Sequence, residues 1–185
     1  VEFTADEEIH ENHAAGDYVV TFLSGGQAIN DATITYKNPG NANTYTATYT
    51  VAAGDTGGNI TFSIAFKDLA NNDGTAVTTV DDSSGVIVDK TLPSLTTISI
   101  ASDRSPGTFA KPGDVVTLTM VANEIISEPV VIFKSGGVAV ADSTITYGGS
   151  GTNWTAAYTV DAADTDGAVT FSAAITDLAG NLDTF

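Results

Sequence analysis

The side chains of this chain that could do chemistry are almost all carboxylates. The sequence has 23 Asp and Glu residues against 6 Lys and Arg, which gives a formal net charge of −17. Cysteine is absent, so disulfides and thiolate metal sites are excluded. The two histidines, His10 and His13, lie in one polar stretch with no evident third ligand, which favours a surface loop over a transition-metal site. The chemistry that remains is acid–base catalysis or the binding of a hard cation.

Composition removes several classes of function. Paired carboxylates are abundant, but none accompanies a recognisable nucleophile, base or oxyanion loop, so the sequence does not predict an enzyme. The strong negative charge argues against nucleic acid, whose phosphates need Lys and Arg partners, and against anionic membrane surfaces. No apolar run approaches the roughly 18 residues of a membrane span, so no membrane insertion is expected. With 42% hydrophobic residues the chain is expected to fold around a core.

The elements that must position these acids are strands. Segments such as TYTATYTV at 44–51 and VTLTMV at 116–121 alternate in polarity and are rich in Thr, Val and aromatic residues. Gly, Asn, Asp and Ser clusters separate them, and no helical period is present. The pattern predicts an all-β sandwich. The expected strands are 1–5, 18–23, 27–36, 44–51, 59–67 and 75–89 (broken at 81–85), then 94–101, 114–122, 130–134, 138–147, 154–160 and 168–176.

An internal repeat with an offset near 110 residues organises these strands. VVTFLSGG at 19–26 matches VVIFKSGG at 130–137, and NITFSIAFKDL at 59–69 matches AVTFSAAITDL at 168–178. The opening VEFTADEEI resembles VTLTMVANEII at 116–126. We therefore expect two domains, 1–90 and 91–185. The first lacks its opening strand and the second lacks most of its closing strand, so we expect the polypeptide to continue in both directions.

A set of short motifs gives a family resemblance. VDKTLP at 88–93, Gly113-Asp114, ANEI at 122–125 and DLAGN at 177–181 together resemble the bacterial Ig-like repeats of giant surface adhesins. The resemblance implies two tandem Ig-like β-sandwich domains, an extracellular location, a stalk or spacer role and calcium near the linkers. At 68–72 the first unit has DLANN, with Asn71 in place of glycine; Asn tolerates a left-handed turn, so we expect the turn to persist.

The Ig-like arrangement predicts where the acids gather. Loops after the second and sixth strands lie at the pole where the chain enters a domain, and the loop after the fifth strand lies at the exit pole. Calcium requires about 6–8 oxygen ligands, so converging acids predict Ca²⁺ sites. The predicted ligands at the domain junction are Asp89, Asn123, Glu124, Asp177, Asn181 and Asp55. A second predicted group places Asp6, Glu7 and Glu8 opposite Asp68, Asn72 and Asp73. The alternative is a surface of solvated loop acids.

Three functions compete on these grounds. The leading hypothesis is a non-catalytic repeat of a large extracellular protein, whose partners are neighbouring Ig-like repeats and whose stiffness depends on calcium. The second is a subunit of a filament, surface layer or particle coat that self-assembles by strand exchange. The third is a carbohydrate-binding module, for which no aromatic platform is evident. Asn59 and Asn153 begin glycan-acceptor triplets, and the sequence does not decide whether they are used.

Overall fold

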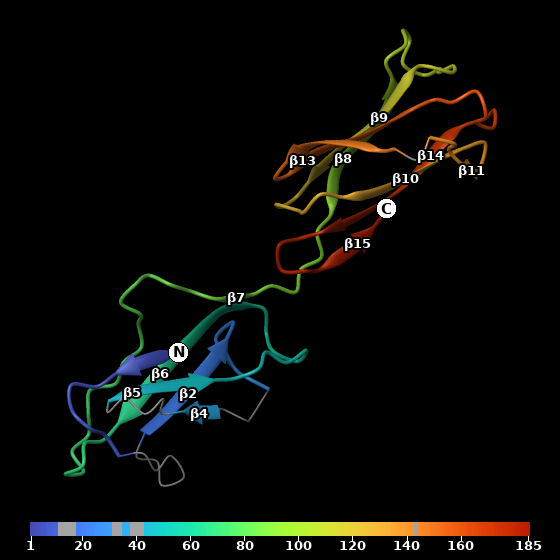
Figure 1. Ribbon diagram of the computed structural model, residues 1–185. Helices are drawn as coiled ribbons and strands as arrows, with labels where there is room; N and C mark the ends of the chain where they lie inside the picture. The colour runs from blue at the N-terminus through green and yellow to red at the C-terminus, as the bar shows by residue number, and fades with distance from the viewer. Residues whose placement is uncertain (11–17, 31–34, 38–42, 143) are drawn as a thin grey trace. The chain divides into compact units, whose positions relative to one another are not determined.

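The chain is all-β, as the sequence predicts. The computed structural model describes residues 1–10, 18–30, 35–37 (backbone only), 43–142 and 144–185, and no helix occurs among them (Figure 1). The chain divides into two compact units, Val1–Asp89 and Lys90–Phe185, with the boundary one residue before the expected one. Each unit carries two antiparallel sheets with a buried apolar layer, which is a β-sandwich.

The first unit combines a three-stranded and a four-stranded sheet. The three-stranded sheet has the order β1-β5-β4, with β1 Glu2–Thr4, β5 Thr44–Thr48 and β4 Thr35–Lys37. The other has the order β3-β2-β6-β7, with β3 Gln27–Ala28, β2 Tyr18–Ser24, β6 Gly58–Phe66 and β7 Ile87–Val88. The core of the first unit contains Ile9, Tyr18, Val20, Phe22, Tyr45, Ala47 and Ile64.

The second unit has two four-stranded sheets. One has the order β12-β13-β9-β8, with β8 Leu95–Ser102, β9 Val115–Ala122, β12 Thr146–Ser150 and β13 Asn153–Thr159. The other has the order β11-β10-β14-β15, with β10 Val130–Ser135, β11 Val138–Ala139, β14 Val169–Thr176 and β15 Leu182–Thr184. Its main core holds Val116, Leu118, Met120, Val131, Phe133, Ala156, Tyr158 and Ala173.

Alternation along each strand decides which side chains enter the core. On β9, Val116, Leu118 and Met120 are buried, while Thr119 between them is exposed. Successive side chains of a strand point to opposite faces, so this period of two places one face of the sheet in the interior. Burying an aliphatic side chain of this size stabilises the fold by about 1.5–3 kcal/mol, and the alternating strands therefore supply the main folding force.

Strand pairings fix which residues of the two units correspond. Phe3 on β1 lies opposite Tyr45, and Met120 on β9 lies opposite Trp154. Isolated bridges join Ile9 to Asp68 and Ile126 to Asp177. Both observations give the same correspondence between the two units near the start of the chain. Phe3 corresponds to Met120 and Ile9 corresponds to Ile126, an offset of 117 residues.

Two expected strands are wrong in extent. Residues 138–147, expected as one strand, form β11 in one sheet and the start of β12 in the other. Between them the Ala141 N–H donates to Asp164 (2.7 Å) and the Thr144 N–H donates to Asp142 (2.9 Å), so side-chain acceptors take the place of a ladder. Residues 27–36 divide in the same way into β3 and β4, with residues 31–34 outside the described part.

The expected strand 75–89 is also shorter. It pairs with β6 through the Ile64–Val77 bridge, through the Ile60 N–H that donates to the Val86 carbonyl, and through β7. The expected break lies between Val77 and Val86. There the Ser84 N–H donates to Asp82, and Ser83 has φ 62°, which is turn geometry.

The turn that contains Asn71 persists, as expected. Asn71 has φ 69° and Gly180, at the matching position, has φ 93°. Both N–H groups donate to the carbonyl of the Asp three residues earlier, at 3.0 Å and 3.3 Å. Asparagine is one of the few residues other than glycine that visits this region readily, so the substitution leaves the turn intact. In the described part of the chain there is no helix with the length and apolar character needed to cross a membrane.

Candidate cation site

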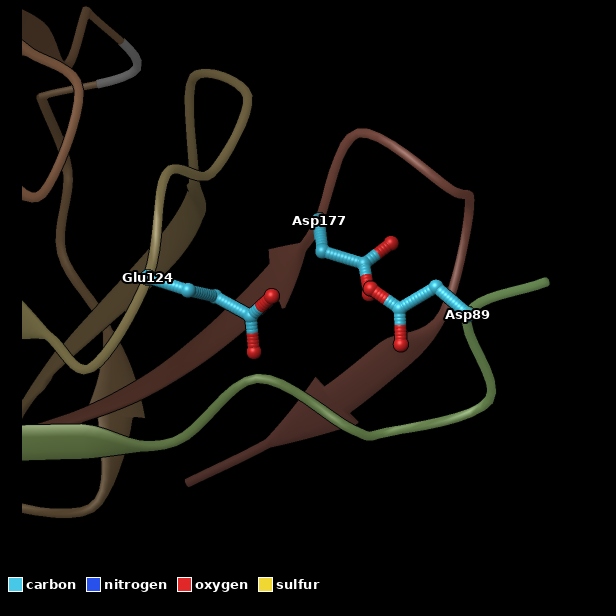
Figure 2. A group of neighbouring side chains, drawn as sticks. All are labelled: Asp89, Glu124 and Asp177. Atoms are coloured by element: carbon cyan, nitrogen blue, oxygen red, sulfur yellow. The ribbon is translucent and has the colours of Figure 1, made fainter. Parts of the chain in front are cut away.

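Three carboxylates meet where the linker passes the second unit. Asp89 follows β7, Glu124 follows β9 and Asp177 follows β14. Each offers a carboxylate oxygen, and the three oxygens lie within 4.8 Å of one another. Figure 2 shows the carboxylates of Asp89 and Asp177 side by side, with that of Glu124 directed toward them from another segment. The structure therefore brings together three of the six residues predicted at the junction.

Asp177 is the most firmly held of the three. It is only 3% exposed. One oxygen accepts the Asn181 backbone N–H and the other accepts the Asn181 side-chain amide, both at 2.8 Å. Burial by itself would raise the pKa of Asp177, but hydrogen bonds from Asn181, Ala179 and Gly180 together lower it below the ordinary value of 3.8. The loop therefore orients an ionised carboxylate, and Asn181 acts on the site through Asp177.

The loop that carries Glu124 is fixed on both sides. Before it, Asn123 exchanges hydrogen bonds with Ser94: the Asn123 side-chain oxygen accepts the Ser94 N–H at 2.7 Å, and the Ser94 carbonyl accepts the Asn123 N–H at 2.9 Å. After it, the buried Ile126 anchors the chain and bridges to Asp177. Asn123 thus ties the segment before β8 to this loop. Glu124 is left half-buried and directed toward the other two acids.

This arrangement suits a hard divalent cation. Two oxygens bound to one Ca²⁺ lie no more than about 5 Å apart, twice the Ca–O distance, and the observed separations meet that limit. Carboxylates from three separate segments, with no thiolate or imidazole beside them in the described part, match calcium better than zinc or copper. Magnesium, which keeps most of its waters, needs fewer protein ligands.

Asp55, the sixth residue predicted at the junction, has a different environment. It is 1% exposed and accepts hydrogen bonds within its own unit, from the Asn30 N–H at 2.6 Å and the Ala52 N–H at 2.8 Å. Asp164 does the same in the second unit, with the Ala141 N–H at 2.7 Å and the Asp161 N–H at 3.0 Å. Each of these two carboxylates therefore joins two loops of its own unit.

The acids predicted as a second site in the first unit differ in their surroundings. Asp6 and Glu8 are exposed. Asp68 accepts the backbone and side-chain N–H groups of Asn72 at 2.8 and 2.7 Å, which lower its pKa. Asp73 pairs with Lys67. Over the described ranges of the chain, no second group of three metal-ligating side chains approaches as closely as the one at the linker.

Sequence reasoning missed two features that strand register reveals. With Ile9 in the place of Ile126, the residue that takes the place of Glu124 is Glu7, which the sequence had placed only in the general group, and Glu8 takes the place of Ile125. The second is Asp164 as the counterpart of Asp55. The matching segments AAGDT at 52–56 and DAADT at 161–165 carried that signal.

Comparison with protein-family models, with curated proteins and with solved structures finds no match for this chain.

Proposed function

We propose that this chain is a non-catalytic structural part of a large extracellular surface protein, and that calcium bound at Asp89, Glu124 and Asp177 stiffens it. In this role the protein is a stalk or spacer built from tandem Ig-like units of the kind found in bacterial adhesins. The two sandwich units, the strand pairings that they share and the motifs around the linker support this assignment.

The observation that carries the proposal is the position of Asp89. This residue is joined directly to Lys90, at the boundary of the two units, and its carboxylate lies with those of two loops of the second unit. An ion that binds all three would hold the linker to that unit and restrict its motion. Because such an ion binds the folded state and not the unfolded chain, it also stabilises the fold by mass action.

A calcium titration tests the proposal directly. We expect millimolar or lower calcium to raise the melting temperature of the second unit. It should also narrow the distribution of distances within the particle that small-angle scattering measures, and a chelator should reverse both effects. Asp89→Asn and Glu124→Gln should abolish the two responses and leave the metal-free melting temperature nearly unchanged. These variants remove ligands but bury no new group.

Matched controls separate a bound ion from screening. Asp81→Asn and Glu128→Gln remove the same charges at exposed positions outside the cluster, and they should keep the full calcium response. Sodium chloride at equal ionic strength controls for relief of repulsion in a chain of charge −17. If all four variants responded equally to calcium, the acids would be a solvated surface and the calcium proposal would be wrong.

A second candidate function has one observation in its favour. The β1 edge of the first unit has no strand partner on its outer side within the described residues. An open edge of this kind is a common means of joining chains, so the alternative is a subunit of an extracellular filament, surface layer or particle coat assembled by strand exchange.

A further inference from the structure

One sheet face of the second unit exposes two large apolar side chains on a central strand. Val130 and Ile132 of β10 are 63% and 54% exposed, and they alternate with the buried Val131 and Phe133. In its sheet β10 lies between β11 and β14 (Figure 1), so this exposure does not come from an unpaired strand edge. Neighbouring apolar side chains exposed on one face, unlike scattered ones, indicate a contact surface.

The shape of this face is complementary to itself. In the ladder between β10 and β14, Val130 lies opposite Ala174 and Ile132 lies opposite Ser172. Residues directly opposite on neighbouring strands point to the same face of the sheet, so a row of large side chains on β10 runs beside a row of small ones on β14. A two-fold rotation about an axis parallel to the strands places the large row of one copy over the small row of another.

The charge of the face also suits a second copy. Its outward-facing residues on the two strands are Val130, Ile132, Lys134, Thr170, Ser172, Ala174 and Thr176. None of them is an acid, although the chain has 23. Two chains of net charge −17 repel each other, so they approach most easily where neither presents a carboxylate. A basic partner would instead be attracted to the acidic loops.

The first unit lacks the larger of the two exposed side chains. Thr21 of β2 lies opposite Ser63 of β6, as Ile132 of β10 lies opposite Ser172 of β14. Threonine therefore occupies the position of Ile132 in a sheet with the same pairing. The isoleucine is a feature of the second unit and not a requirement of the sandwich, so the fold should tolerate its replacement by threonine.

We propose that this face, centred on Val130 and Ile132, is an interface between two copies of the chain, which pack these sheets face to face. Ile132 of each copy packs on Ser172 of the other, and Val130 on Ala174. The strands β10 and β14 have 6 and 8 residues. Four strands of this length present roughly 450 Å² per copy, at about 3.4 Å per residue and about 4.8 Å between strands. Stable complexes bury about 800 Å² per partner, so the dimer is weak and reversible.

Sedimentation equilibrium of the 185-residue chain in chelator tests the proposal. We expect a monomer–dimer equilibrium with a dissociation constant of roughly 0.1 mM. Added sodium chloride should strengthen the dimer, because salt screens the repulsion between two acidic chains. An interface made of ion pairs would show the opposite salt dependence and would overturn the proposal.

Variants of the chain locate the interface. Ile132→Thr gives the second unit the residue of the first, and it should weaken dimerisation by at least about ten-fold, since both copies lose an apolar contact. Ile87→Thr makes the same change at a strand position that is 68% exposed in the first unit, and it should have no effect. Ser172→Asp places a carboxylate beneath the isoleucine of the other copy and should abolish the dimer. Thr119→Asp adds the same charge at an exposed position on β9 and should change dimerisation little.

Thermal melting at concentrations where the chain is monomeric shows whether each variant is folded. A chain that stays monomeric up to about 1 mM, or equal weakening by Ile132→Thr and Ile87→Thr, would overturn the proposal. A dimer that Ser172→Asp leaves intact would do the same. This inference does not depend on the calcium site, so dimerisation should persist in Asp89→Asn. Dimerisation only in the presence of calcium would overturn this interface and leave the calcium proposal standing.

Discussion

Asp55 and Asp177 are both buried carboxylates, but their surroundings give them different roles. The oxygens of Asp55 accept backbone N–H groups from two segments of one unit. Those of Asp177 are oriented by Asn181 and lie next to two further acids. Residue type alone does not separate a structural acid from a candidate ligand. The neighbouring acids do, because both carboxylates accept backbone N–H groups but, of the two, only Asp177 lies beside two further carboxylates.

The difference predicts opposite responses to mutation. Asp55→Ala leaves the N–H groups of Asn30 and Ala52 without their charged acceptor and should lower the free energy of unfolding by about 2–3 kcal/mol, with and without calcium. Asp164→Ala should act in the same way on the second unit. Urea denaturation with and without chelator measures both. If Asp55→Ala instead removed the calcium response at unchanged metal-free stability, Asp55 would be a ligand.

At the scale of elements, tyrosines on the second unit's strands differ in how their hydroxyls are satisfied. The hydroxyl of Tyr147 on β12 accepts the Val131 N–H of β10 at 2.9 Å and so ties one sheet to the other. The hydroxyl of Tyr158 on β13 is buried without a hydrogen-bond partner. Burial first, and then the negative charge of Asp164, raises the pKa of Tyr158, so the group stays neutral.

Removing each hydroxyl tests this asymmetry. Tyr158→Phe deletes an unsatisfied buried oxygen and should leave stability unchanged or raise it by about 1 kcal/mol. Tyr147→Phe leaves the Val131 N–H without its acceptor and should lower stability by about 1–2 kcal/mol. The ring packing is the same in both substitutions, so each serves as the control for the other in thermal or urea unfolding. A loss of stability in Tyr158→Phe would show that its hydroxyl has a partner such as a buried water.

At the scale of the molecule, excess negative charge coexists with acids that the fold stabilises. Arg104 bonds Asp114 through two nitrogens, at 2.6 and 3.1 Å, and this pairing is the main cause of the lowered pKa of Asp114. Backbone N–H groups of Thr144 and Thr159 lower the pKa of Asp142. Hydrogen bonds orient these acids without cancelling their charge, and the formal net charge is −17, so the chain carries a large self-repulsion.

The lowered pKa values set the direction of the pH dependence. Asp114 and Asp142 have pKa values below 3.8 in the folded state and near 3.8 when unfolded. Their contribution is complete above about pH 5 and disappears as pH falls through the folded pKa values. We expect the free energy of unfolding measured in urea to be nearly constant from pH 7 to pH 5 and to decrease as the pH drops below 3.8. Asp114→Asn should reduce that fall. Stability that rises steadily down to pH 3 would show that relief of repulsion dominates.

Much of the fold follows from local pattern. Alternation of apolar and polar residues predicts β9, β10, β13 and β14 nearly to their ends, because a strand with one buried face must repeat every two residues. The same local rule predicts the turn at Asn71. It does not predict that residues 138–147 cross from one sheet to the other, since that depends on Asp164, a residue distant in sequence.

The sequence by itself determined the all-β class, most strands and three acids of the candidate cation site, because strand period and loop position are local properties. Tertiary structure alone decided that Asp55 joins two loops of the first unit and that Glu7 takes the place of Glu124. Each of these depends on which atoms approach from other strands. Register and the partners of a buried oxygen are set by packing across the sandwich.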